Sequence, residues 1–362
     1  MKIVYLTLEA PREGQASYVH VHEIIDGLEK QGVEVRQYQP PYAAKPVSPN
    51  HFMRLLYALW LQCRLWACWE RGSVLYVRAH YLAFPSALIA RLFRIPVFQE
   101  INGPYEDVFV THPSLKIFRN ILIPMQRWQY RVATGLITVT QALQGWANAQ
   151  GRRTDCTLIS NGANTNLFKP GLSRPEDAPK RYVVFFGGLT RWHGVPVMLG
   201  AVQSAGWPEN VKLVVIGDGQ ETPSIQEACK DTDRIVFLGK RPYKDVAPYV
   251  SNALAGLVII NNPDQRSSTG VLPLKLYETL ACGVPAIVTD LPGQADLVRR
   301  EACGLVIPVD DPSALASAVT RLSVYPQEAE MMGRNGHEAA VRDHSWFARA
   351  QQTLAFIKSN LP

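Results

Sequence analysis

The sequence has no long hydrophobic run. No window of about 18 consecutive apolar residues occurs anywhere in the 362-residue chain, so no segment is predicted to cross a membrane. The opening MKIVYLTLEAP carries one Lys and an apolar run that stops at Glu9, which is too short for the core of a secretory signal. We therefore expect a cytoplasmic protein.

The six cysteines follow no ordered pattern. None forms a Cys-x-x-Cys pair or has a histidine at zinc-finger spacing, which argues against a zinc site and a disulfide framework. His20 and His22 are two residues apart on a predicted helix and point to different faces, so they do not form a metal pair. No metal and no cofactor are expected.

Composition and charge narrow the class of protein further. A hydrophobic content of 47% excludes a disordered chain, and the length suggests roughly two domains. Residues 1–175 carry 19 Lys and Arg against 11 Asp and Glu, whereas the remainder carries 18 against 20. The first half is therefore expected to meet an anionic surface or ligand, unless its charge is merely solvated. Nucleic acid is not an expected partner, because no aromatic–basic strand motif appears.

Short apolar runs typical of buried strands alternate with helical stretches along the whole chain. In the first half we expect strands at 3–8, 33–38, 74–77, 96–100 and 136–139, and helices at 17–30, 52–71 and 114–132. In the second half the expected strands are 182–186, 212–216, 235–238, 255–260 and 286–289. Such alternation gives parallel strands joined by right-handed crossovers. The sequence therefore predicts two doubly wound, Rossmann-like α/β domains.

A proline-rich segment separates the two series. Residues 169–181 contain three Pro, one Gly and six charged residues, which is linker composition. We place the linker at 169–180, one domain at 1–168 with 345–362, and the other at 181–344. Because ligands bind at the carboxyl ends of parallel strands, the active site is expected in a cleft across which the two domains face.

Three glycine-containing loops in the second half could hold a phosphate. The first, Gly187-Gly-Leu-Thr-Arg-Trp-His-Gly194, joins a buried strand to a helix, and helix N-termini attract anions. Arg191 and His193 lie within it. Read alone, such a loop could also be a plain connection between a strand and a helix. The second loop contains Gly217 and Gly219 and follows the next strand, where it could also be an ordinary tight turn.

The third loop leads from Gly270 into a helix that is predicted to begin near Pro273. Lys275 and Glu278 are three residues apart and share one helix face. A carboxylate at this place can accept the hydroxyls of a ribose, and the lysine can meet a phosphate. The alternative is a surface ion pair.

The order and spacing of these pieces resemble the family 4 glycosyltransferases of the GT-B fold, which are retaining enzymes that use sugar nucleotides. The resemblance extends from the loop at Gly14, through Ile159-Ser-Asn-Gly-Ala-Asn-Thr-Asn-Leu-Phe-Lys-Pro170, to Pro285. The sequence departs from the family at two places, since Gly188 and His193 replace the usual Arg and Lys, and Gly270 replaces a Glu. A subgroup with Trp-His-Gly and Pro-Leu-Lys-Leu-Tyr-Glu motifs is more similar.

The resemblance implies a retaining, metal-independent hexosyltransferase of surface polysaccharide or glycolipid synthesis. The hexose would move from a nucleotide diphosphate-sugar to a glycan or lipid-linked acceptor. Arg191, His193, Lys275 and backbone amides would stabilise the leaving diphosphate, and Glu278 would hold the ribose. The remaining donor-binding residues are expected to be Gly187, Gly188, Leu189, Gly194, Gly217, Gly219, Gly270, Val271 and Leu272.

The first domain is expected to hold the acceptor, with Gly14, Glu100 and Asn102 as candidates. Glu100 and Asn102 follow a strand, where they could bind sugar hydroxyls, although a helix cap or turn would look the same. His80 is similarly placed, and we read it as part of a loop lining.

Basic residues mixed with tryptophan suggest that the first domain also meets an anionic membrane surface. Lys116, Arg119, Arg127 and Arg131 share one side of the predicted helix 114–132, which Pro124 is expected to kink or split. The segment 52–71 adds three Trp and three Arg. Helices packed on a sheet with arginines reaching outward would give the same pattern.

Two other functions share this architecture. A sugar-nucleotide 2-epimerase would need carboxylates around the hexose, and Gly270 in place of Glu disfavours it. A non-catalytic partner subunit of another transferase would explain the two departures. The donor base, the hexose, the acceptor, the linkage, the oligomeric state and the effect of Gly270 on donor choice do not follow from the sequence.

Overall fold

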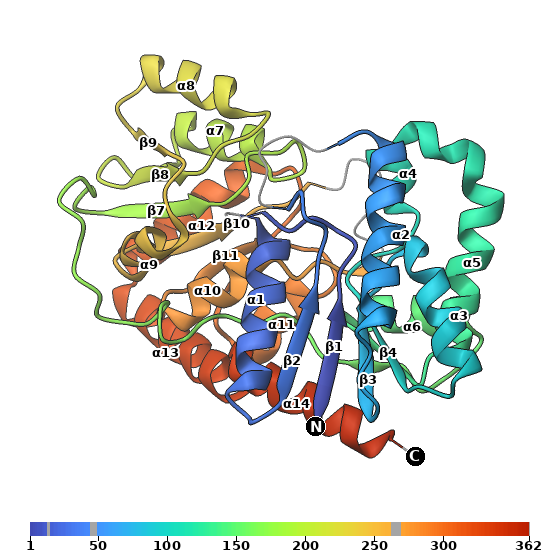
Figure 1. Ribbon diagram of the computed structural model, residues 1–362. Coiled ribbons are helices and arrows are strands. Elements are labelled where there is room, and N and C mark those ends of the chain that lie inside the picture. Colours follow the sequence, from blue (N-terminus) through green and yellow to red (C-terminus); the bar gives the residue numbers. More distant parts are fainter. Residues whose placement is uncertain (13–14, 44–48, 262–268, 362) are drawn as a thin grey trace. The chain divides into compact units, whose positions relative to one another are not determined.

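The computed structural model describes residues 1–12, 15–43, 49–261 and 269–361, which divide into two compact units (Figure 1). The first unit is Met1–Ser160 with Arg349–Pro362, and the second is Asn161–Ala348. The segment 169–180, predicted as a linker, lies inside the second unit, where Leu172 and Ala178 pack against the core.

The first unit is built on a six-stranded sheet of order β2-β1-β3-β4-β5-β6. Every pairing in it is parallel. Its strands are β1 (Lys2–Leu6), β2 (Glu34–Tyr38), β3 (Ser73–Arg78), β4 (Val97–Ile101), β5 (Gly135–Thr138) and β6 (Thr157–Leu158). The strand order reverses between β1 and β3, which is where ligands bind in open parallel sheets.

The second unit repeats this design with the order β12-β11-β10-β7-β8-β9, again parallel throughout. Its strands are β7 (Tyr182–Phe186), β8 (Lys212–Ile216), β9 (Ile235–Gly239), β10 (Ala255–Val258), β11 (Ala286–Thr289) and β12 (Gly304–Ile307). Here the order reverses between β7 and β10. The predicted pair of doubly wound α/β domains is confirmed.

Helices cover both faces of each sheet. In the first unit they are α1 (Ala16–Glu29), α2 (His51–Ala67), α3 (Phe84–Leu92), α4 (Asp107–Thr111), α5 (Arg119–Val132) and α6 (Gln141–Gly151), with 3-10 turns at Tyr81–Ala83 and Pro113–Phe118. In the second they are α7 (Val195–Gln203), α8 (Thr222–Asp231), α9 (Tyr243–Ser251), α10 (Leu274–Ala281), α11 (Gln294–Glu301), α12 (Pro312–Val324) and α13 (Pro326–Asp343). The last helix, α14 (Trp346–Ser359), begins in the second unit and ends in the first.

The strand β7 shows why the sheets are buried on both sides. Val183 and Phe185 pack with α7 and α12, whereas Tyr182, Val184 and Phe186 pack on the other face with α9 and α10. A strand covered on both faces has no polar side, which explains its unbroken apolar sequence. In the first unit, α1 and α14 share one face and α2 the other.

The structure differs from the predicted elements at three places. β6 and β12 were not predicted, because both are short strands at sheet edges. Pro124 does not split the predicted helix: the break lies earlier, between Phe118 and Arg119, and α5 continues past Pro124 to Val132. Pro124 is the sixth residue of α5, so the helix forgoes one backbone hydrogen bond there, to the Asn120 carbonyl.

Candidate active site

The loop after β7 lies beside the point at which the second sheet reverses its strand order. It ends at Gly194, whose positive φ of 58° starts α7. A Cβ on Gly194 would lie 2.4 Å from Cγ2 of Ile259, the residue that follows β10. Only glycine fits there, so the loop is held tightly between the two central strands.

The two glycine loops pack directly on each other. A Cβ on Gly217 would lie 1.9 Å from the Gly187 carbonyl oxygen, and a Cβ on Gly219 2.4 Å from that of Leu189. The amide of Gly187 donates to Ile216, and the amide of Leu189 to Asp218. These two predicted donor-binding amides are therefore used within the protein. Gly217 and Gly219 permit the contact between the loops, a structural role that the sequence left open.

Lys275 on α10 contacts this loop. Its Nζ lies 3.9 Å from the centroid of the Phe185 ring, and a Cβ on Gly187 would lie 3.4 Å from it. The side chain is buried, and Nζ has no hydrogen-bond partner among the described residues. Burial lowers the pKa of Lys275 to about 7, although the nearby Glu278 carboxylate opposes the change. A buried ammonium that makes no hydrogen bond is unfavourable, and such a group is typical of a site that binds an anion.

His193 is neutral in this loop. Burial, and then the charge of Lys275, lower the pKa of His193 to about 3. Its Nδ1 contacts the Gly188 carbonyl oxygen, which can only accept, so Nδ1 carries the proton. Arg191 is exposed, and no acidic partner for it occurs among the described residues. The positive charge of the loop therefore comes from Arg191 and Lys275, whereas His193 fixes the backbone at Gly188.

Glu278 lies one turn after Lys275 and is also buried. Its Oε1 accepts a hydrogen bond of 2.6 Å from the Tyr243 hydroxyl. Before the helix, the Val271 amide donates to the Pro292 carbonyl, and the Leu272 carbonyl accepts from Asn161. Gly270 has a φ of 82°, which turns the chain into this segment. The structure thus brings Lys275 to the first loop, as predicted.

The first unit contains a buried polar cluster around Glu100. Its carboxylate accepts from Tyr76 at 2.8 Å and from Arg78 at 3.2 Å, lies 2.7 Å from His20 Nε2, and also contacts Asn102. Burial alone would raise the pKa of Glu100, but His20, Arg78 and Asn102 outweigh it and hold the pKa well below its usual range. Glu100 is therefore a fully engaged anion.

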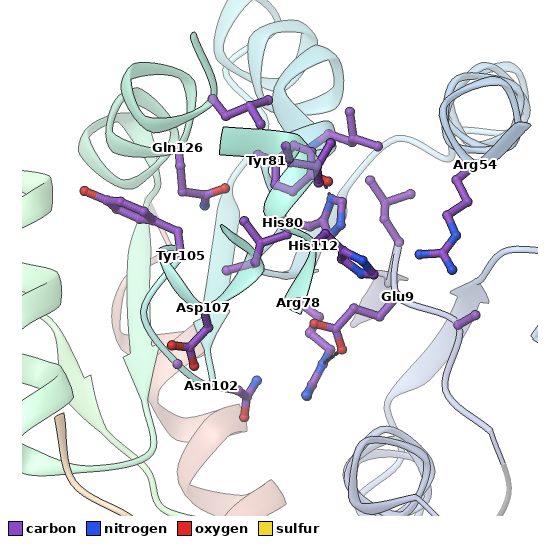
Figure 2. Close-up of a pocket in the computed structure, with 18 of the residues that line it drawn as sticks. Glu9, Arg54, Arg78, His80, Tyr81, Asn102, Tyr105, Asp107, His112 and Gln126 are labelled. Atoms are coloured by element: carbon purple, nitrogen blue, oxygen red, sulfur yellow. Dashed lines mark hydrogen bonds and ion pairs between the residues drawn. The ribbon is translucent and has the colours of Figure 1, made fainter. Parts of the chain in front are cut away.

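A cavity of about 990 Å³ opens above this cluster (Figure 2). Asn102 lines it together with Arg78, Glu9 and His80, but Glu100 does not. Arg78 donates to Glu9 at 2.9 Å, which joins the ends of β1 and β3. His80 Nδ1 accepts from the Leu82 amide at 3.1 Å, and burial lowers the pKa of His80 to about 4, so Nε2 carries its proton.

The sequence analysis missed Arg78 and Glu9. Both stand at the carboxyl ends of strands beside the reversal of strand order, and that position is the signal that identifies them. Gly14, the third predicted acceptor residue, lies outside the described residues.

The tryptophans expected at a membrane surface divide into two groups. Trp66 and Trp69 pack against the first unit's core, and Trp66 Nε1 donates to Ser86. Trp60 is 49% exposed, with the Arg64 guanidinium over its ring. Arg127 donates to Tyr105 and Gln150 and so belongs to the packing of α5 on α6.

Neither a membrane span nor a metal cluster occurs in the part of the chain that the structure describes. None of its helices is long and apolar enough to cross a bilayer, and no group of three His, Cys, Asp or Glu side chains is arranged to hold a metal ion.

Comparison with known proteins assigns both units. Residues 18–167 match the model of Glycosyltransferase Family 4, and residues 180–323 match that of Glycosyl transferases group 1. The chain belongs to the GT-B glycosyltransferases. An uncharacterized glycosyltransferase of Methanocaldococcus jannaschii is 22% identical over 99% of this chain and 98% of its own length.

Other relatives of this GT-B glycosyltransferase have named activities. A phosphatidyl-myo-inositol mannosyltransferase of Mycobacterium leprae is 26% identical over 70% of this chain and 66% of the relative. Among solved structures, HepE of Anabaena in complex with UDP has a TM-score of 0.73 at 17% identity, covering 99% of this chain and all of that one. Sucrose-phosphate synthase of Thermosynechococcus elongatus has a TM-score of 0.72 at 20% identity, covering 99% and 98%. These structures share the fold.

Proposed function

We propose that the protein is a retaining hexosyltransferase that moves a hexose from a nucleotide diphosphate-sugar to a glycan or lipid-linked acceptor. The observation that carries the proposal is the buried Lys275 Nζ, which lies beside the Gly187 loop at the reversal of strand order and has no hydrogen-bond partner among the described residues. The structures of HepE with UDP and with UDP-glucose support a nucleotide-sugar donor in this fold.

In this proposal the donor occupies the second unit. Lys275, Arg191 and the N-terminal amides of α7 face the diphosphate, and Glu278 accepts the ribose hydroxyls. A cation about 4 Å from the leaving oxygen contributes up to about 4 kcal/mol in a half-wet site. Charge stabilisation of this size matters because the leaving group gains negative charge as the anomeric bond breaks.

The reaction would proceed on one face of the sugar. The bond from the anomeric carbon to the diphosphate oxygen breaks, and the bond to the acceptor oxygen forms on the same face. The acceptor's hydroxyl proton passes to the departing diphosphate, so neither a protein nucleophile nor a metal ion takes part. Product NMR is expected to show a retained anomeric configuration, and EDTA is expected to leave the rate unchanged. An inverted product would contradict this mechanism.

The acceptor is assigned to the cavity of the first unit. Asn102 lies at its wall, where its amide can contact a sugar hydroxyl. Glu100 acts indirectly in this scheme, because its carboxylate holds Arg78 and Asn102 in place. The relatives' names support a carbohydrate or lipid acceptor, since one is a phosphatidyl-myo-inositol mannosyltransferase and WaaG takes part in lipopolysaccharide biosynthesis.

A panel of UDP-, GDP- and ADP-sugars tests the donor site. One nucleotide series is expected to raise the Tm of the wild-type protein and to leave that of Lys275→Met unchanged. The matched control is Lys230→Met, which removes an exposed lysine of α8 in the same unit. If the sugar nucleotides raise the Tm of Lys275→Met as much as that of the wild-type protein, the proposed donor site is incorrect.

The proposal places the enzyme in the cytoplasm, on the inner face of the membrane. Ile117 and Ile121 are 80% and 60% exposed beside the exposed cations Lys116 and Arg119. Apolar and basic side chains in this combination bind anionic lipid surfaces. Flotation with anionic vesicles at low salt is expected to carry the protein upward. If neutral vesicles carry as much protein upward as anionic vesicles do, this part of the proposal is contradicted.

A further inference from the structure

The cavity of the first unit is lined partly by polar and partly by apolar side chains. Glu9, Arg78 and Asn102 line it with polar groups, whereas the exposed side chains of Phe52, Leu55 and Phe118 form an apolar rim. The apolar residues come from α2 and from the 3-10 turn that precedes α5. A ligand that fills this space therefore has a polar end and an apolar end.

The apolar side chains are exposed where they line the cavity. Phe52 is 66% exposed, Phe118 is 51% and Leu55 is 39%. Exposed apolar side chains that gather at the rim of a polar cavity are a common feature of ligand-binding grooves. Covering them with a hydrocarbon chain would remove this surface from water, which is favourable in proportion to the area buried.

Arg54 supplies the cavity with a positive charge that forms no ion pair with any acid among the described residues. Its Nε donates to the Pro49 carbonyl at 3.0 Å, and no carboxylate of the described residues lies within salt-bridge distance of its guanidinium. Arg78, by contrast, is paired with both Glu9 and Glu100. Figure 2 shows the Arg54 side chain extending from its helix toward the hollow that Glu9 and His112 also face.

Arg54 lines the cavity, and its charge affects two other residues that line it. Burial, followed by the charge of Arg54, lowers the pKa of His112. Burial raises the pKa of Tyr81, and Arg54 opposes that rise. His112 and Tyr81 both line the cavity, so the guanidinium lies close to the space a ligand would occupy.

We propose that the acceptor is a phosphate-linked long-chain lipid, with its phosphate on Arg54 and its chain along Phe52, Leu55 and Phe118. A guanidinium binds phosphate oxygens through paired hydrogen bonds, and Phe52 and Leu55 of the same helix line the same cavity as Arg54. This inference rests on the proposed transferase function and specifies its acceptor class. An isoprenoid phosphate and a phosphoglyceride share this chemistry.

Octyl phosphate is a soluble probe for such a site. Titration calorimetry is expected to detect binding of octyl phosphate to the full-length protein, at least tenfold tighter than inorganic phosphate or octyl glucoside. Arg54→Gln is expected to weaken the binding of octyl phosphate at least tenfold, and Arg54→Lys is expected to weaken it less. The control Arg91→Gln removes an exposed arginine of α3 that does not line the cavity. It is expected to bind like wild type.

A second pair of variants tests the apolar rim. Phe118→Ser is expected to weaken the binding of octyl phosphate severalfold and to leave the binding of inorganic phosphate unchanged. The control Phe93→Ser, at an exposed phenylalanine outside the cavity, is expected to change neither affinity. Geranyl phosphate and lysophosphatidic acid then distinguish the two lipid sources. Binding that is equal in wild type and Arg54→Gln, or inorganic phosphate as effective as octyl phosphate, would overturn the inference.

The outcome separates this inference from the proposed function. If octyl phosphate fails to bind while sugar nucleotides still shift the Tm, only the lipid acceptor is wrong. If sugar nucleotides also fail, the transferase function itself is contradicted. Each variant's unliganded Tm shows whether it is folded.

Discussion

At the scale of single residues, the two units treat buried charge in opposite ways. Glu100 is surrounded by donors and keeps its charge, whereas Lys275 is buried with no hydrogen-bond partner for Nζ among the described residues and has a pKa of about 7. A paired buried charge holds its neighbours in place, and an unpaired one is available to a ligand. The same distinction separates Arg78 from Arg54 in the first unit.

The pKa of Lys275 predicts how donor binding depends on pH. Lys275 is protonated below about pH 7 and loses its charge above it, so donor affinity is expected to fall above pH 7, by up to about tenfold per pH unit. The folded pKa lies below the unfolded value, so stability is expected to rise from pH 7 toward 10. Donor titrations and urea unfolding between pH 6 and 9 measure both trends. A flat affinity profile would argue against contact with Lys275.

His193 provides a second test at this scale. His193→Ala removes the donor to the Gly188 carbonyl, and we expect turnover to fall more than about tenfold, a loss of about 1.4 kcal/mol, with the fold intact. His193→Asn is expected to recover most of the rate, because its amide can donate at the Nδ1 position. If His193→Asn is as slow as His193→Ala, the imidazole acts through charge instead of backbone positioning.

At the scale of elements, the strands follow from the sequence because both of their faces are buried. The unbroken apolar run of β7 predicts its bounds correctly, whereas β6 and β12 lie at sheet edges and lack such a run. The helix starts at Val195 and Leu274 were also predicted, from the glycine and proline that precede them. Where the two glycine loops touch could not be predicted, since it depends on two strands packing side by side.

That contact can be tested at Gly217. Gly217→Ala places a methyl group 1.9 Å from the Gly187 carbonyl oxygen at a φ of 148°, so the loops must separate. We expect a loss of stability of about 2 kcal/mol or more and a loss of donor binding. Gly206→Ala is the control, because its nearest neighbour is 3.8 Å away. Urea midpoints compare the two, and equal midpoints would show that the loops are not tightly packed.

At the scale of the whole molecule, the chain's last residues belong to its first unit. Ala350, Leu354 and Ile357 of α14 join the core that contains Ile3 and Tyr5. Phe356 packs against Phe98, and a Cβ on Gly135 would lie 2.7 Å from the Phe356 ring. The first unit is therefore complete only when both ends of the chain are present.

Ile357→Ala tests this arrangement. Ile357 is fully buried, and truncation is expected to destabilise the first unit by about 2–5 kcal/mol. The Tm shift caused by a sugar nucleotide, a property of the second unit, is expected to persist. Exposed Phe347→Ala serves as a comparison on the same helix. Calorimetric scans with and without donor measure both effects. If Ile357→Ala leaves the unfolding temperature of the first unit unchanged, the proposed role of α14 is contradicted.

Sequence pattern alone established the two parallel sheets and the loops at their carboxyl ends, because strand burial and helix starts are local properties. The pattern predicted Lys275 and Asn102 as binding-site residues on that basis. The sequence pattern could not predict which charges are paired. Glu9, Arg78 and Glu100 are far apart in the chain and meet only because β1, β3 and β4 lie side by side. The same folding leaves the Arg54 guanidinium without an ion-pair partner, and Lys275 Nζ without a hydrogen-bond partner, among the described residues, and these two cations mark the two proposed ligand sites.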